Sequence, residues 1–83
     1  MIEYDVVFHR TAVSFLLGRA SRERRLLLQF LDRLGNDPYQ VGDFDVADAT
    51  GRRHEVKRIG GVRVTFWPDH AVKEVHVTSI ERI

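Results

Sequence analysis

Four side chains in the last third of the sequence have the chemistry needed to bind and cut a phosphodiester. Lys57 and Arg63 carry cations that bind phosphate oxygens. His76 carries an imidazole, a group that changes charge between about pH 5 and 8 and so moves protons at neutral pH. Trp67 adds an indole on which a nucleic-acid base can stack. These four residue types predict an anion- or RNA-binding surface. In it, Lys57 and Arg63 would bind phosphate groups and His76 would transfer a proton.

The four residues alternate with apolar residues, as strands of a half-buried sheet do. Side chains on a strand point to opposite faces in turn, so a core made by one set sends its neighbours outward. The predicted inward set is Val56, Val62, Val64, Phe66, Val75 and Val77, and the predicted outward set is Glu55, Lys57, Arg63, Thr65, Trp67 and His76. The same pattern also fits an ordinary solvated face, with cations paired to carboxylates, His76 a plain surface residue and Trp67 packed at an edge.

A glycine pair, Gly60-Gly61, lies between two of these strands, and the length of the turn decides which side chains face each other. A two-residue turn would pair Lys57 with Val64 and divide the apolar residues between the faces. A three-residue loop, 59–61, pairs Lys57 with Arg63 and separates an apolar face from a polar one. We therefore predict the three-residue loop, with Lys57 beside Arg63.

The remaining sequence predicts a first strand, two helices and two more strands around this hairpin. Their expected positions are a strand over 4–9 with Ile2, Tyr4, Val6 and Phe8 on one face; a helix over 12–17 capped by Thr11; a helix over 22–34 capped by Ser21 and stopped by Gly35; an edge strand with Phe44 and Val46; and a last strand over 72–80. The order β-α-α-β-β-β-β predicts an α+β fold: two N-terminal helices packed on a small, mostly antiparallel sheet of four to five strands.

Length and composition limit the function classes. The 83 residues predict one domain, 1–83, and the absence of cysteine excludes disulfides and thiolate metal sites. His9, His54 and His70 lack metal-ligand spacing, so neither a metal nor another cofactor is expected. The acidic N-terminus does not resemble a signal peptide, and no apolar run is long enough to span a membrane. We expect a soluble cytoplasmic protein.

Charge is strongly segregated along the chain although its net value is only +1. Residues 36–50 carry four aspartates and no cation, whereas residues 51–63 carry five cations and one acid. Local potential governs encounter with nucleic acid, so a near-neutral total does not exclude an RNA surface. The alternative is that the acidic segment folds over the basic strands and cancels their charge.

Four segments, taken in order, give the chain a resemblance to the RelE/ParE superfamily of bacterial toxin–antitoxin toxins. In this family a helix ending in Leu…Asp-Pro precedes a segment of Gly, any residue, Arg and an apolar residue. The matching segments here are 4–8 with Thr11-Ala12; 31–38, which ends in Asp37-Pro38; 56–64, which contains Gly61-Val62-Arg63-Val64; and 75–82. The resemblance covers nearly the whole chain and implies the fold derived above.

The resemblance implies a toxin of a type II module that a cognate antitoxin protein neutralises. Such toxins either cleave messenger RNA on the ribosome or inhibit DNA gyrase. The RelE-like nuclease is our leading expectation, with catalytic residues Lys57, Arg63, His76 and Arg82 and RNA-binding residues Arg53, Arg58 and Trp67. A ParE-like gyrase inhibitor or a non-catalytic binding relative is the alternative, favoured by Glu55, an acid where the nuclease pattern has a cation. Leu26 and Leu28 lie off the core stripe and are candidate antitoxin contacts; whether the chain forms a homodimer is left open.

Overall fold

The computed structural model of the protein describes residues 3–83 and contains five strands and two helices. The elements in chain order are β1 (Asp5–Phe8), α1 (Arg10–Leu17), α2 (Ser21–Asn36), β2 (Phe44–Ala47), β3 (Arg53–Ile59), β4 (Val62–Asp69) and β5 (Glu74–Arg82). This order confirms the predicted β-α-α-β-β-β-β arrangement. Ile2, which was expected to share a face with Tyr4, lies outside the described residues.

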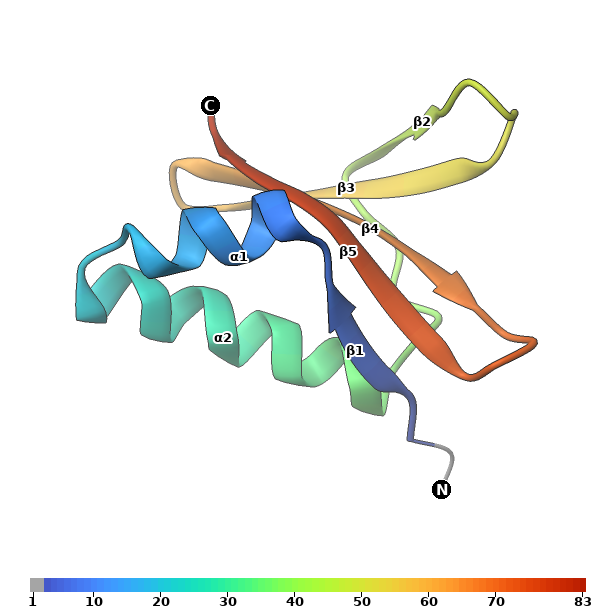
Figure 1. The fold of residues 1–83 in the computed structure, drawn as a ribbon, viewed down its shortest axis with the longest axis horizontal. Helices are drawn as coiled ribbons and strands as arrows, with labels where there is room; N and C mark the ends of the chain where they lie inside the picture. The colour runs from blue at the N-terminus through green and yellow to red at the C-terminus, as the bar shows by residue number, and fades with distance from the viewer. Residues whose placement is uncertain (1–2) are drawn as a thin grey trace.

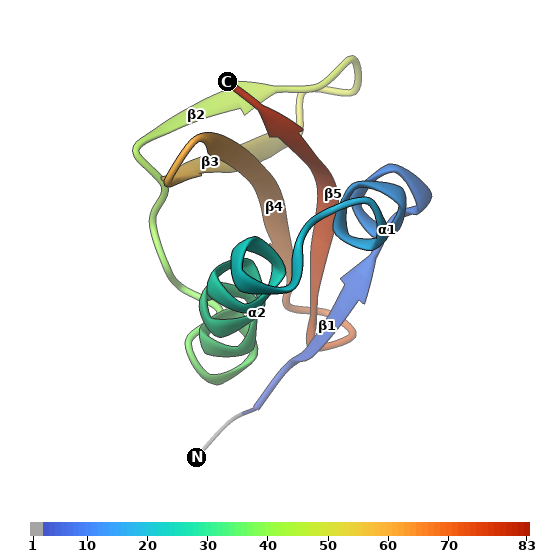
Figure 2. The same cartoon turned by 90° about the vertical axis from the view of Figure 1, so that its left-hand side faces the viewer.

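The strands form one sheet in the order β1-β5-β4-β3-β2. β1 runs parallel to β5, and every other neighbouring pair is antiparallel. Both helices lie on the same side of the sheet, and the β2–β3 hairpin projects past them (Figure 1, Figure 2). The mostly antiparallel α+β sheet is therefore confirmed, with five strands. One face is covered by helices, and we call the other the open face.

The core lies between the helices and β1, β4 and β5. The predicted stripe on α2 is almost fully buried there, and it meets the inward-facing residues of the last two strands. Its members include Leu27, Phe30, Leu31, Leu34, Val62, Val64, Phe66, Val75, Val77 and Ile80. Full burial of one such side chain contributes about 1.5–3 kcal/mol. For β4 and β5 the sequence alternation thus predicted the buried set correctly.

Both helices begin one or two residues earlier than predicted, so the expected caps were wrong. α1 starts at Arg10 after His9, and the Thr11 hydroxyl donates to the carbonyl of Thr78 at 2.9 Å instead of capping the helix. α2 starts at Ser21 itself, and its N-cap residue, Ala20, makes no side-chain capping bond. The hydroxyl of Thr11 is used to tie α1 to β5, which sequence spacing alone does not reveal.

Gly35 lies inside α2 and does not end it, because the helix continues to Asn36. The backbone N–H of Tyr4 donates to the carbonyl of Gly35 at 2.8 Å. A Cβ at position 35 would lie only 2.7 Å from the Tyr4 carbonyl oxygen. The absence of a side chain therefore lets β1 approach the helix, and this close contact is the physical reason for glycine here.

The predicted three-residue loop between β3 and β4 was wrong. The structure has the two-residue turn Gly60-Gly61, with Lys57 opposite Val64 and Arg58 opposite Arg63. Gly60 has φ 59°, as the first central residue of a type II′ turn requires. Directly paired residues share a face, so Lys57 lies on the helix side of the sheet and Arg63 on the open face.

The two-residue turn still leaves the apolar side chains of β3 buried, because both faces of this strand have apolar neighbours. Val56 is only 4% exposed, but it lies outside the main core, on the open face opposite Phe44 of β2. Ile59 lies opposite Val62 and packs against the core from the other face. Because β2 provides a second apolar contact, β3 can place one valine on each side without exposing it.

Candidate functional site

The open face holds four of the seven residues predicted to act on RNA. Arg58, Arg63, Trp67 and His76 lie on this face by strand register and alternation. Lys57, Arg53 and Arg82 have the opposite parity and lie on the helix side. The structure therefore does not place Lys57 beside Arg63. The expectation that these two cations bind phosphate side by side was wrong.

Each of the three cations on the helix side has a carboxylate partner. Lys57 Nζ lies 3.4 Å from Asp43 Oδ1, Arg53 lies 2.6 Å from Asp45, and Arg82 lies 3.3 Å from Glu23 of α2. Asp43 also accepts a hydrogen bond from the backbone N–H of Arg58. That bond, followed by the bond and charge of Lys57, lowers the pKa of Asp43 despite partial desolvation. The acidic segment thus folds back onto part of the basic hairpin. This agrees in part with the alternative expectation that the acidic segment covers the basic strands and cancels their charge.

One end of the open face, next to the β3–β4 turn, carries Arg58 and Arg63; we call it the arginine end. The two residues are direct cross-strand partners, so their like charges lie close together. Arg63 is held by Glu81 at 3.2 Å, whereas Arg58 has no carboxylate partner among residues 3–83. The Nε of Arg63 is buried without a hydrogen-bond partner in this described range. A hollow of about 130 Å³ lies here, lined by Phe44, Val46, Val56, Arg63, Thr65 and Glu81.

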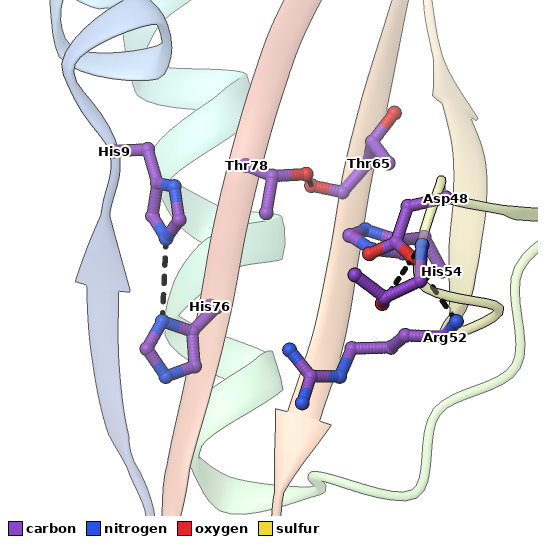
Figure 3. A network of polar contacts seen from close by, with 8 residues as sticks. His9, Asp48, Arg52, His54, Thr65, His76 and Thr78 are labelled. Atoms are coloured by element: carbon purple, nitrogen blue, oxygen red, sulfur yellow. Dashed lines mark hydrogen bonds and ion pairs between the residues drawn. The ribbon is translucent and has the colours of Figure 1, made fainter.

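The opposite end of the face carries Arg52, Trp67, His76 and His9; we call it the imidazole end. Trp67 and His76 are cross-strand partners whose rings stack with centroids 4.6 Å apart and an interplanar angle of 10°. The Arg52 guanidinium carbon lies 3.9 Å from the centroid of the Trp67 ring. His9 lies just beyond β1, and its Nε2 is 3.3 Å from Nδ1 of His76 (Figure 3). These contacts form a continuous row of planar groups from the start of β3, over β4 and β5, to the end of β1.

Trp67 uses its ring for protein contacts. β3 and β5 flank β4 on its two sides, so Arg52 and His76 approach the indole from opposite directions. A nucleic-acid base would have to displace one of them to stack on the ring. This arrangement favours the packing role that the sequence left open for Trp67.

Asp48 organises the turn that brings Arg52 to Trp67. Its Oδ1 accepts bonds from the hydroxyl and backbone N–H of Thr50 and from the backbone N–H of Arg52, at 2.6, 2.8 and 3.0 Å. Its Oδ2 lies 3.0 Å from Nε2 of His54, which is buried beside Trp67 (Figure 3). The Thr50 hydroxyl and then His54 are the largest causes that hold the pKa of Asp48 well below its usual range, against partial desolvation.

The two ends are too far apart to hold the same phosphate group. Arg63 and Trp67 are four residues apart on one strand, which corresponds to about 13 Å. The sequence-predicted residues of the open face therefore divide into a cationic group near Arg63 and an aromatic and imidazole group near His76. Each end can contact a different nucleotide of one extended strand.

Sequence reasoning missed Arg52, His9 and the role of His54. His9 reaches His76 only because β1 pairs in parallel with β5, a neighbour relation that the predicted element order did not specify. Arg52 was counted only as part of the basic segment, although it directly follows a turn glycine, Gly51, with φ 86°. The Asp48-x-Thr50 spacing, typical of a side-chain-stabilised turn, was the available signal.

Within residues 3–83, no group of three His, Cys, Asp or Glu side chains is arranged to hold a metal ion. In the same described range, no helix is long and apolar enough to cross a membrane.

No protein-family model matches the sequence, and no curated protein matches it. Solved structures of RelE proteins, however, match the fold over nearly the whole chain. The archaeal RelE–RelB complex from Pyrococcus horikoshii OT3 matches with TM-score 0.78 and 20% identity, covering 99% of this chain and 96% of that chain. The RelBE2 toxin–antitoxin complex from Mycobacterium tuberculosis matches with TM-score 0.79 and 20% identity, covering 99% and 100%. A double mutant of the E. coli toxin RelE in the free state matches with TM-score 0.69 and 17% identity, covering 96% of this chain and 83% of that chain.

The likeness extends through both helices and the sheet and confirms the fold that the sequence resemblance implied. At these identities it is a statement about architecture, and the chemistry has to be argued from this chain's own residues. The chain has the fold of the RelE toxins.

Proposed function

We propose that this protein is the toxin of a type II toxin–antitoxin module and cleaves messenger RNA on the ribosome in the cytoplasm. The observation that carries the proposal is the likeness to RelE, which covers 99% of this chain at TM-scores of 0.78 and 0.79. The open face adds residues suited to the chemistry, since cations and imidazoles lie together on it.

The two ends of the open face have different proposed roles on the message. Arg63 and Arg58 bind the phosphates of one nucleotide, because a guanidinium matches the geometry of two phosphate oxygens. Arg52 binds a phosphate beside the cleavage point and so positions the strand, and His76 belongs to the proton-transfer site. Lys57 and Arg82, expected to be catalytic, face the helix side and are paired with acids, so they have no role in this proposal.

The proposed antitoxin contact is an apolar groove between α2 and the β3–β4 turn. Its volume is about 410 Å³, and its lining includes Leu26, Leu27, Ile59 and Val62. Leu26 is 55% exposed, which is costly for a leucine without a partner. This location agrees with the sequence expectation for Leu26; an amphipathic antitoxin segment would cover it.

A binding protein, including a gyrase inhibitor, is the second candidate. The observation in its favour is that the predicted cations Lys57, Arg53, Arg82 and Arg63 are all paired with carboxylates. Such pairs lower the positive potential available to RNA. A surface that works by protein contacts alone does not require free cations.

Induced expression followed by mapping of message ends tests the proposed function. We expect loss of translation and new 5′ ends within translated regions, and the same cuts on purified ribosomes programmed with message. DNA damage with intact messages, or inhibition of purified gyrase, would support the second candidate. Normal growth with intact messages and active gyrase would overturn both.

A further inference from the structure

The imidazole end contains a chain of three titratable groups. Nδ1 of His76 lies 3.3 Å from Nε2 of His9, and Nε2 of His76 lies 3.4 Å from Oε1 of Glu74. One ring nitrogen of His76 is hydrogen-bonded to His9 and the other faces the Glu74 carboxylate, and its side chain is only 19% exposed. His9 is exposed, and its Nδ1 has no hydrogen-bond partner among residues 3–83. The free ring nitrogen of this pair is thus on His9.

We propose that His9 is the residue that takes a proton from the RNA substrate, and that His76 and Glu74 are positioning residues behind it. The inference rests on the proposed function, because it assigns the proton acceptor of the same RNA-cleaving site. It changes the sequence expectation, in which His76 met the substrate directly.

The positions of the ring protons follow from the chemistry of the three groups. The negative charge of Glu74, 3.4 Å from Nε2 of His76, favours a proton on that nitrogen. A neutral imidazole then carries its lone pair on Nδ1, which accepts from the Nε2–H of His9. This fixes the His9 tautomer with an unprotonated Nδ1, which is the form that a general base requires. Positive charge that develops on His9 is stabilised through His76 by the charge of Glu74.

The reaction step is an internal transfer at one phosphate of the message. Nδ1 of His9 takes the proton of a 2′-hydroxyl as the 2′-oxygen bonds to the adjacent phosphorus. The bond from phosphorus to the 5′-oxygen breaks, and that oxygen takes a proton from water. The hydroxide that remains is neutralised by the proton on His9. The products are a 2′,3′-cyclic phosphate and a 5′-hydroxyl, and no metal or oxidant enters the balance.

Position and charge indicate that this end can hold the RNA strand around the reacting phosphate. Arg52 lies over one face of Trp67 and His76 stacks on the other, so its cation is held on the same row of rings as the proposed base, with the indole and the His76 ring between it and His9. Among residues 3–83 no carboxylate pairs with Arg52, which leaves its charge available to a phosphate oxygen.

The test is cleavage of a defined message on purified programmed ribosomes by wild type and by His9→Ala. General-base catalysis contributes about 10²- to 10⁴-fold, so we expect a loss of that size in His9→Ala. Imidazole added to the buffer should restore part of the rate, because it supplies the missing base. His70→Ala, which removes a histidine from the β4–β5 turn, is the matched control and should cleave at the wild-type rate.

The positioning role of His76 needs a conservative variant. His76→Asn keeps an amide oxygen able to accept from His9, whereas His76→Leu removes the acceptor. We expect His76→Asn to retain more activity than His76→Leu, with far-ultraviolet circular dichroism confirming that both fold. A message with a 2′-deoxy sugar at the cut site should be resistant to wild type.

The outcomes separate this inference from the proposed function. Cleavage by wild type with full activity in His9→Ala, or with no imidazole rescue, would overturn the His9 assignment and leave the nuclease proposal intact. Cleavage of the 2′-deoxy message would overturn the internal-transfer step. A wild type that cuts no message would overturn both proposals.

Discussion

The two ends of the open face hold their guanidinium groups in different ways. At the arginine end, Arg63 is positioned by Glu81, whose negative charge offsets part of its positive potential. At the imidazole end, Arg52 lies on the Trp67 ring and has no carboxylate partner among residues 3–83. An aromatic ring orients a cation by cation–π attraction of about 0.5–2 kcal/mol and leaves its full charge. In the proposed function, the two ends serve binding and chemistry, respectively.

Because the two ends have different proposed roles, measuring KM and kcat separately distinguishes them better than measuring RNA affinity alone. A residue that binds ground state and transition state equally changes KM, whereas one that acts only in the transition state changes kcat. The arginine end should affect KM and the imidazole end kcat.

Among the arginines of the open face, Arg52 should have the largest effect when it is removed. In the proposed function Arg52 positions the cut nucleotide at the proposed base; loss of such positioning can cost about 10²-fold, and we expect this in kcat for Arg52→Ala with KM little changed. Single-turnover cleavage on programmed ribosomes measures it. The matched control is Arg53→Ala, which removes the adjacent arginine that points the other way and pairs with Asp45. Equal losses in the two variants would contradict the division between the ends.

Arg63→Ala should weaken RNA binding with kcat nearly unchanged. A hydrogen bond to a charged group contributes about 1.5–3 kcal/mol, so we expect KM to rise by roughly 10- to 150-fold. The slope of log affinity against log salt should become less steep by about 0.7, the value for one phosphate on a single strand. Lys57→Ala, a cation on the other face of the same hairpin, is the control. A larger effect from Lys57→Ala would restore the sequence-based assignment.

The sequence predicted the fold better than the site, for a physical reason. On β4 and β5, residues such as Phe66 and Val75 have to face the helices, so alternation alone determined their side. On β3, Val56 could be buried on either face because β2 covers the second one with Phe44. Alternation then could not distinguish the two registers, and the Gly60-Gly61 pair permits the positive φ that either turn needs, which the two-residue turn has at Gly60. His9 was missed because strand order is a tertiary property.

The turn at Gly60-Gly61 sets the register of the arginine end, and two alanine variants can test it. Gly60 has φ 59°, a left-handed conformation that costs a residue with a side chain about 1–2 kcal/mol, so Gly60→Ala should lower the free energy of unfolding by that amount. Gly61 does not have positive φ, and a Cβ there meets nothing within 4 Å, so Gly61→Ala should be nearly neutral. Urea unfolding measures both variants. Equal destabilisation would argue against the two-residue turn.

Asp48→Asn should produce the smallest effect and should act at the imidazole end. The pKa of Asp48 is lowered in the folded chain, so its charge stabilises the fold above its ordinary value, near pH 4. That stabilisation is lost as the pH falls through the lowered pKa, because the unfolded chain takes up the proton first. The difference in unfolding free energy between wild type and Asp48→Asn should therefore be present at pH 7 and shrink below about pH 4.

Fluorescence of Trp67, the only tryptophan, shows whether a substitution changes the imidazole end of the open face. Asp48 holds the backbone N–H of Arg52, so Asp48→Asn should loosen Arg52 from the indole and shift the emission at pH 7. Asp43→Asn removes another carboxylate with a lowered pKa, but one bound to Lys57 and Arg58, and it should leave the emission unchanged. A shift in Asp43→Asn equal to that in Asp48→Asn would mean that the two ends are mechanically coupled and cannot act as separate sites.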